Sequence, residues 1–326
     1  MRRRDLITLL GGTAAMVPIA ARAQGAPMPV IGYLSANAPI PDLLKELRSG
    51  LAESGFYEGQ TVVIEYRSAE GRYDRLPGLA ADLIRRRVDV IVTGGGTLSA
   101  RAAGAATSTI PIVALIGADP VAMGMVGSLS HPGGNVTGVA QLVTESDSKR
   151  LQLLHELVPA ASTIAYLVNP TLPNVVRNTE SIAADGRALG VTITVVKAST
   201  DGDLPAAFAA VSKSRVGALL VSADSYFFMR REEIVALSAG IAVPTMYFFR
   251  EFVIAGGLIS YGTRLADAYR QMGVYVARIL KGAKPSDLPI TQQSENIELV
   301  INLKTANALG LTIPPSLLAR ANEVIE

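Results

Sequence analysis

Residues 88–120 read VDVIVTGGGTLSARAAGAATSTIPIVALIGADP, and this stretch decides the fold class. An apolar run at 88–93 ends in glycines, small residues at 98–107 predict a helix, and a second apolar run follows at 110–116. Strand, helix and strand at this spacing are typical of a βαβ unit, whose two strands lie parallel in one sheet. The sequence therefore predicts an α/β fold with parallel sheets.

The same alternation of strand and helix occurs in two series along the chain. The predicted strands lie at 30–34, 61–67, 88–93 and 110–116, and again at 163–168, 191–197, 217–222 and 243–248. Both series place a proline just inside a strand that follows a helix, at Pro111 and at Pro244. Because each series is long enough to build a sheet of its own, we expect two similar, doubly wound Rossmann-like lobes.

The last part of the chain contains a strand at 256–261 and a strong amphipathic helix at 267–280, after the second series is complete. We therefore expect the chain to return to the first lobe through a multi-strand hinge, with crossings near 139–145 and 248–254. The predicted units are a first lobe of 28–140 plus about 253–290, a second lobe of 143–250, and a tail of 291–326 that packs across the lobes or on one of them.

The first 23 residues have the pattern of an export signal. Arginines at 2–4 precede an uncharged apolar stretch at 6–20, and Ala21-Arg22-Ala23 fits a signal-peptidase site. The apolar stretch, about 15 residues, is shorter than the roughly 20 that span a bilayer. Arg3-Arg4 also fits a twin-arginine signal, so both the general secretory route and the twin-arginine route remain open. We expect an exported, soluble periplasmic protein.

Charge and cysteine content exclude some partners. The chain has 30 basic and 28 acidic residues, of which the signal holds four Arg and one Asp, so that 26 basic and 27 acidic residues remain in the mature chain. No basic surplus is left to favour a nucleic-acid partner. The chain has no Cys, so we expect no disulfide and no lipid anchor after the signal.

The predicted ligand site follows from the topology. In open parallel sheets ligands bind at the carboxyl ends of the strands, and two facing lobes bring both sets of loops to one cleft. We predict that the ligand contacts Ser35, Asn37, Gly95, Gly96, Thr97, Gly117, Asp119, Asn169, Asp224, Ser225, Tyr247 and Tyr261.

Two of these loops indicate the chemistry of the ligand. At 94–97, glycines, the free N–H groups of the next helix and the Thr97 hydroxyl suit a carboxylate, although a tight strand-to-helix turn needs the same glycines. Asp224 either pairs with an ammonium group or caps the helix that follows it, and the sequence leaves both open. Together the loops favour an amino acid or a related carboxylate.

Motifs of common enzymes do not occur in the sequence. The segment 32–37 lacks the dinucleotide fingerprint, and neither a phosphate loop nor a G-x-S-x-G elbow is present. His131 lies in a predicted turn and His155 on a predicted helix, without evident metal partners. We therefore expect no catalytic residue, no metal and no cofactor. A two-domain α/β enzyme acting on a small molecule is the alternative.

Several segments resemble the ABC-transporter substrate-binding family, in particular its TrpX-like group with the type I periplasmic-binding-protein fold. The matching segments are 1–12 (MRRRDLITLLGG), 31–35 (IGYLS), 117–121 (GADPV), 132–138 (PGGNVTG) and 149–154 (KRLQLL). The resemblance runs from the signal to about residue 315. It implies closure of the two lobes around a small solute and delivery of that solute to an ABC permease in the inner membrane.

The resemblance also implies residues and ligands. The cleft positions of the family correspond here to Ser35, Thr97, Asp119, Asn169 and Asp224, and its known members bind aromatic or aliphatic amino acids. Only 5% of the chain is aromatic, and the stacking faces available from the sequence are Tyr33, Tyr226, Phe227, Tyr247 and Tyr261. We expect a monomer, since a dimer interface would obstruct the hinge.

Overall fold

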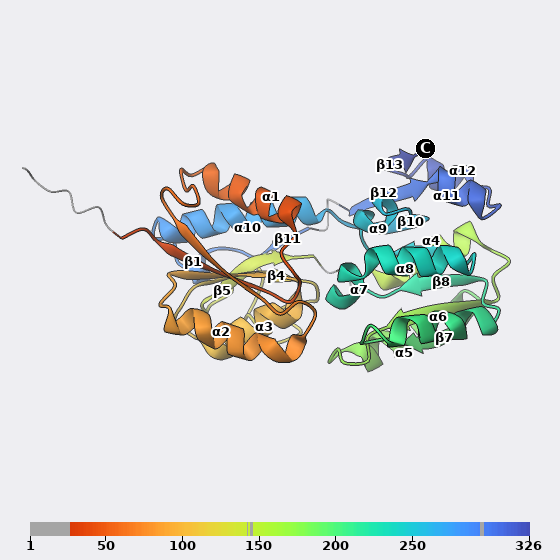
Figure 1. Cartoon of the computed structure of the whole chain (residues 1–326), viewed down its shortest axis with the longest axis horizontal. Coiled ribbons are helices and arrows are strands. Elements are labelled where there is room, and N and C mark those ends of the chain that lie inside the picture. The colour runs from red at the N-terminus through yellow and green to blue at the C-terminus, as the bar shows by residue number, and fades with distance from the viewer. Residues whose placement is uncertain (1–26, 142, 144–145, 294–296) are drawn as a thin grey trace, which may run out of the picture.

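The computed structural model describes residues 27–141, 143, 146–293 and 297–326, and it consists of two α/β lobes that lie side by side (Figure 1). The predicted export signal at 1–23 lies outside the described residues. Within them, no helix has the length and apolar character needed to cross a membrane.

The first lobe is built on a sheet of order β11-β5-β4-β3-β1-β2, in which every pair of neighbours is parallel. Its strands are β1 (Val30–Ser35), β2 (Val63–Ser68), β3 (Val90–Gly94), β4 (Ile112–Ile116), β5 (Val136–Ala140) and β11 (Thr291–Gln292). Its helices are α1 (Pro41–Ala52), α2 (Leu76–Arg85), α3 (Thr97–Ala106) and α10 (Leu265–Leu280), with short 3₁₀ turns η1 (Tyr73–Arg75) and η2 (Pro285–Asp287). In Figure 1 helices α1 and α10 cover one face and α2 and α3 the other, which explains why β3 and β4 are buried at every residue.

The second lobe is built on a sheet of order β13-β12-β10-β9-β8-β6-β7. Its strands are β6 (Thr163–Val168), β7 (Thr192–Lys197), β8 (Ala218–Val221), β9 (Thr245–Tyr247), β10 (Ile259–Thr263), β12 (Ile297–Asn302) and β13 (Glu323–Ile325). Its helices are α4 (Asp147–Leu157), α5 (Val175–Ala188), α6 (Asp203–Lys213), α7 (Ser225–Met229), α8 (Arg231–Gly240), α9 (Arg250–Ile254), α11 (Leu303–Ala308) and α12 (Pro315–Leu318). Apart from the antiparallel pair of β10 and β12, its neighbouring strands are parallel. The prediction of two doubly wound lobes is confirmed.

The segment 253–263 lies in the second lobe, where the sequence had placed it in the first. Strand β10 pairs with β9 and with β12, so the crossing expected near 248–254 occurs instead at Arg264, between β10 and α10. The prediction was wrong because an apolar run gives no information about which of two sheets it joins. Beyond the crossing, α10 packs on α1 so closely that a Cβ atom at Gly50 would lie 2.0 Å from the carbonyl oxygen of Arg270.

The end of the chain divides between the two sheets. Strand β11 adds to β5 at the edge of the first sheet, whereas β12 and β13 extend the second. The chain thus crosses between the sheets after β5, after β10 and after β11. Several crossings of this kind let the lobes rotate relative to each other while they remain covalently tied.

Candidate functional site

A cavity of about 860 Å³, counted with the part that opens to solvent, lies between the two lobes. Seven of the residues predicted from the sequence line it, and they come from both lobes: Asn37, Gly95, Gly96, Thr97, Gly117, Asp224 and Ser225. The carboxyl ends of the parallel strands therefore meet at one cavity, as the topology requires.

The start of α3 presents backbone N–H groups at the cavity. Gly95 and Gly96 have φ angles of 72° and 86°, a region that glycine enters without steric cost, and they turn the chain from β3 directly into the helix. The N-cap residue of α3 is Gly96, which has no side chain to cap the helix, so no N-cap side chain competes with an anion for the first N–H groups. The Thr97 Oγ1 accepts the N–H of Gly117 at 3.0 Å and keeps its own proton to donate.

Asn37 contributes a buried acceptor from the first lobe. Its side chain is 5% exposed, it lines the cavity, and its Oδ1 has no hydrogen-bond partner among the described residues. The Ser35 Oγ accepts the backbone N–H of Asn37 at 3.1 Å, and the Ser68 hydroxyl donates to the Asn37 carbonyl. Ser35 itself does not line the cavity but fixes the loop that carries Asn37.

Asp224 is a buried carboxylate of the second lobe that lines the cavity, and it caps α7. Its Oδ1 accepts the N–H groups of Tyr226 and Phe227 at 3.0 and 3.3 Å, together with the Nδ2–H of Asn169 at 3.2 Å. Its Oδ2 accepts the hydroxyl of Tyr73 from the first lobe at 3.1 Å. Burial raises the pKa of the Asp224 carboxyl, and these hydrogen bonds oppose part of the shift.

The structure does not bring the other five predicted residues to the cavity wall. Asn169 orients Asp224 from behind, and Ser35 supports Asn37. Asp119 accepts the N–H groups of residues 121 and 122 and so stabilises its own turn. Tyr247 is buried and stacks on Phe252 with ring centroids 4.8 Å apart, and Tyr261 packs at the second core, where its carbonyl accepts from Arg150.

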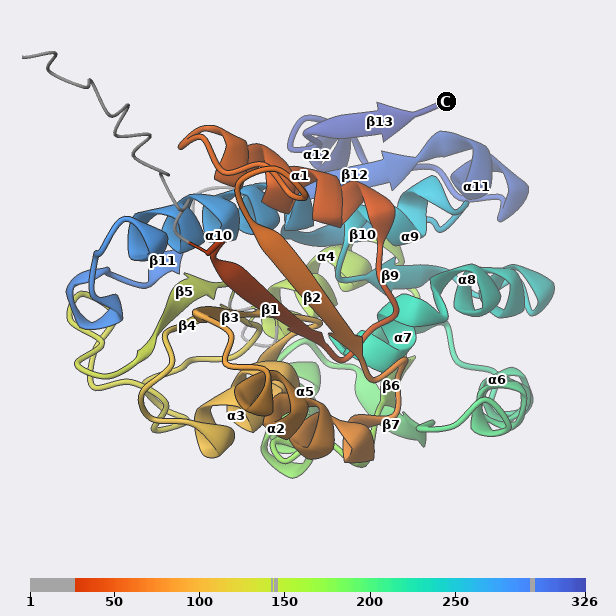
Figure 2. The ribbon, with the colours of Figure 1, turned by 60° about the vertical axis from the view of Figure 1, so that its left-hand side comes forward.

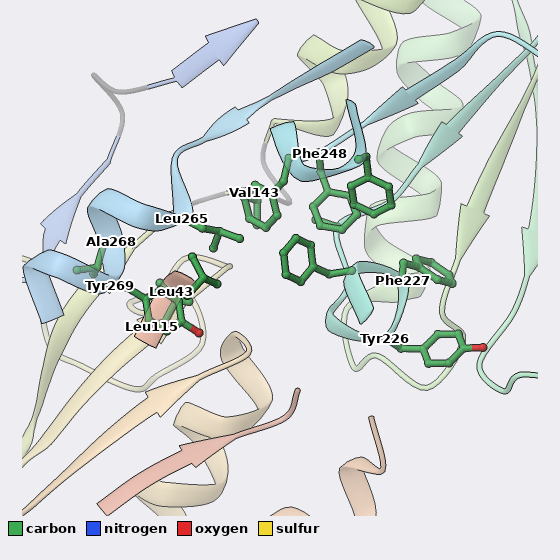
Figure 3. Close-up of a cluster of buried hydrophobic side chains, with 14 of the residues drawn as sticks. Leu43, Leu115, Val143, Tyr226, Phe227, Phe248, Leu265, Ala268 and Tyr269 are labelled. Carbon is green, nitrogen blue, oxygen red and sulfur yellow. The ribbon is translucent and has the colours of Figure 1, made fainter. Parts of the chain in front are cut away.

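Aromatic and aliphatic side chains form most of the cavity wall. The aromatic ones are Tyr73, Phe228, Phe248, Phe249 and Tyr269, and the aliphatic ones include Leu43, Leu98, Leu115, Met123, Val143, Leu172 and Leu265. Figure 3 shows Leu43, Leu115, Leu265 and Tyr269 of the first lobe opposite Phe248 of the second. None of the five rings that the sequence offered for stacking lines the cavity.

The sequence offered the wrong rings for reasons of geometry. Side chains alternate along a strand, so Tyr247 at the end of β9 points into the core while the residues just after it reach the cavity. Tyr73 lies in η1, beyond the end of β2, and Tyr269 lies on α10, where its spacing resembles that of a core residue. The adjacent pair Phe248-Phe249 directly follows β9. The rule that ligands bind at the carboxyl ends of strands could have predicted these two aromatic residues and no other ring of the wall.

The cavity has little charge. Among the described residues that line it, Asp224 is the sole charged side chain, and the other polar side chains, besides the hydroxyls of Tyr73 and Tyr269, are Asn37, Thr97, Gln141, Asn174 and Ser225. No group of three or more His, Cys, Asp or Glu that suits a metal ion occurs in the described part of the chain. The arrangement suits a ligand with a small polar head and an uncharged, apolar body.

Two Rossmann-like lobes, repeated crossings between them and a cavity at the facing strand ends define the class of type I periplasmic binding proteins. The family model of the ABC transporter substrate binding proteins matches residues 40–325. The chain therefore belongs to this family.

Similar proteins extend the comparison. A tyrosine-binding protein from Clostridioides difficile is 25% identical over 281 residues, which cover 86% of this chain and 80% of that protein. A conserved domain protein from Vibrio cholerae has a TM-score of 0.81 at 27% identity, covering 91% of this chain and 99% of its own. An ABC domain from Streptococcus pneumoniae in complex with L-Trp has a TM-score of 0.80 at 28% identity, covering 91% of this chain and all of its own.

Proposed function

We propose that the chain captures an amino acid with a large, uncharged and preferably aromatic side chain between its two lobes. The observation that carries this proposal is the division of the cavity into a small polar part and a larger wall of aromatic and aliphatic side chains. The relatives named for tyrosine and crystallised with L-Trp support the same ligand class.

The polar residues of the cavity suit the head group of an amino acid. The uncapped N–H groups of α3 and the Thr97 hydroxyl bind the carboxylate. The ammonium group binds the unpartnered Oδ1 of Asn37 and the Oδ2 of Asp224, which carries a single donor among the hydrogen bonds described above. Ligand contacts with both lobes favour the closed arrangement, so binding shifts the hinge equilibrium toward closure.

The wider role follows from the family. We infer that the mature protein begins after residue 23, works in the periplasm as a monomer without a lipid anchor, and delivers its ligand to an ABC permease of the inner membrane. The predicted signal and the absence of Cys from the sequence support the location. Binding, and not catalysis, is the activity that the family membership supports.

A ligand panel tests the proposal. Residues 24–326 are mixed with aromatic, aliphatic, acidic and basic amino acids and with sugars, and the melting temperature is measured. A ligand at about 100 times its dissociation constant adds about 2.7 kcal/mol of stability, a shift of a few degrees. We expect shifts from tryptophan, tyrosine and phenylalanine. A shift from sugars or charged amino acids alone would overturn the assignment.

A further inference from the structure

We propose that Tyr73 controls closure of the two lobes, because its hydroxyl forms hydrogen bonds directly with residues of the other lobe and needs no ligand to do so. The part of this inference that concerns ligand affinity rests on the proposed function, whereas the part that concerns closure does not.

Tyr73 belongs to the first lobe and bonds twice to the second. Its hydroxyl donates to the Asp224 Oδ2 at 3.1 Å and accepts the backbone N–H of Tyr226 at 2.7 Å. Both partners lie at the start of α7, the helix that Figures 1 and 2 show beside the ends of β1 and β2. The donor and the acceptor capacity of the hydroxyl are thus both used between the lobes.

A second contact lies beside the first. The Ser225 hydroxyl donates to the carbonyl of Gly95, so three consecutive residues, 224–226, bond to two separate loops of the first lobe. Tyr73, Gly95 and Ser225 also line the cavity. These interlobe bonds therefore form part of the wall that surrounds the ligand, and a rotation that opens the cavity breaks them.

The bonds are strong enough to bias the hinge. A hydrogen bond from a hydroxyl to a buried carboxylate is a charge-assisted one, and losing it changes an equilibrium by about tenfold. Asp224 is 7% exposed in this structure, so replacing Tyr73 leaves its Oδ2 buried without this donor. Ligand affinity falls with the fraction of molecules that can close.

Tyr73→Phe isolates this hydroxyl, and Tyr66→Phe is its matched control. The Tyr66 hydroxyl also makes two polar contacts, accepting from Arg48 and donating to Glu58, but both partners belong to the first lobe. The control therefore removes comparable bonds and leaves the contact between the lobes intact. Ser225→Ala is a second test variant, which removes the bond to the Gly95 carbonyl.

Distance measurements between two labels report closure without any ligand. Because the natural chain has no Cys, Arg101→Cys on α3 and Glu180→Cys on α5 provide unique, exposed attachment points on the two lobes. Double electron–electron resonance is recorded for residues 24–326 and each variant, with and without L-tryptophan. Circular dichroism confirms that every variant is folded.

We expect Tyr73→Phe to lower the ratio of short to long distances about tenfold in the absence of ligand, and Ser225→Ala to change it in the same direction. Tyr66→Phe should match the parent, and saturating L-tryptophan should restore short distances in Tyr73→Phe. If Tyr73→Phe matches the parent, or if Tyr66→Phe opens the lobes equally, the inference is wrong. If L-tryptophan changed the distances in no variant, the proposed ligand class would be wrong. The comparison of Tyr73→Phe with the parent in the absence of ligand would still test the role of Tyr73 in closure.

Discussion

Asp224 combines three tasks in one carboxylate. It caps α7, it receives Tyr73 from the other lobe, and in the proposed function it receives the ammonium group of the ligand. Its burial places a cost on the charged form, which a bound ammonium group offsets. The residue that holds the lobes together and the residue that selects an amine are therefore the same.

The raised pKa of Asp224 predicts opposite effects of pH on stability and on binding. Burial lifts the folded pKa above the unfolded value, so the stabilising contribution is complete at low pH and is lost as the pH rises through the folded pKa. Binding needs the carboxylate, so affinity for L-tryptophan should fall as the pH drops through this raised pKa. Titration calorimetry across this range checks the sign.

Asp224→Asn is the control for this pH dependence. Asparagine also caps helices, so the variant should fold, bind L-tryptophan more weakly and lose the dependence of affinity on acid pH. An unchanged pH profile in the variant would assign the titration to another group.

Asn37 is predicted to bind the ammonium group from the first lobe, whereas Asp224 binds it from the second. Asn37→Ala removes the buried Oδ1 that has no partner among the described residues, and affinity for L-tryptophan should fall about tenfold. Indole-3-propionate, which lacks the amine, should bind the variant and the parent equally well. If the variant lost affinity for both ligands equally, Asn37 would shape the cavity without binding the amine.

At the level of single residues, the strand-end rule found the backbone and polar part of the candidate site but not its aromatic wall. Gly95, Gly96 and Thr97 follow directly from the βαβ pattern, because the turn after a parallel strand must face the cleft. Tyr73 and Tyr269 could not be found in this way, since they reach the cavity from a 3₁₀ turn and from a helix of the returning chain.

Helix α4 anchors the places where the chain crosses between the lobes. Its Arg150 is fully buried and pairs with Asp147 one turn earlier. The guanidinium also donates to the carbonyl of Val143, after β5, and to the carbonyl of Tyr261 in β10 at 3.1 Å. One side chain thus ties together two of the segments that lead into crossings.

Arg150→Met should destabilise the protein strongly. The change leaves the Asp147 carboxylate buried with the Tyr166 hydroxyl, 2.7 Å away, but without its cation. Removing one partner of a buried pair costs about 3–5 kcal/mol, measurable by urea denaturation. Replacing Asp147 by Asn in the same chain should restore part of this loss, whereas additive losses would show that the two side chains do not depend on each other.

At the level of elements, the sequence predicted which segments are strands and helices better than which lobe they join. The helix expected at 267–280 corresponds to α10, Leu265–Leu280, and the strand expected at 256–261 overlaps β10, Ile259–Thr263. Their assignment to sheets depends on long-range pairing, because β10 is shared between β9 and β12, which lie on either side of it in the sheet. The spacing of apolar residues within a segment does not indicate which sheet that segment joins.

The whole molecule consists of two lobes with a cavity between them. The two sheets point their carboxyl ends at one another, the chain crosses between them repeatedly, and contacts on both lobes are needed to enclose a ligand. The chain belongs to the ABC transporter substrate binding family, and the proposed delivery of a ligand to a permease requires a protein that closes on its ligand and reopens.

Titration calorimetry of residues 24–326 with L-tryptophan, tryptamine and indole-3-propionate measures how much each part of the ligand's head group contributes to binding. We predict one site per chain for L-tryptophan and weaker binding of both analogues, since tryptamine loses the contacts at the start of α3 and indole-3-propionate those at Asn37 and Asp224. Equal affinity for all three ligands would contradict the proposed head-group site. Failure of L-tryptophan, L-tyrosine and L-phenylalanine alike to bind would contradict the proposed ligand class.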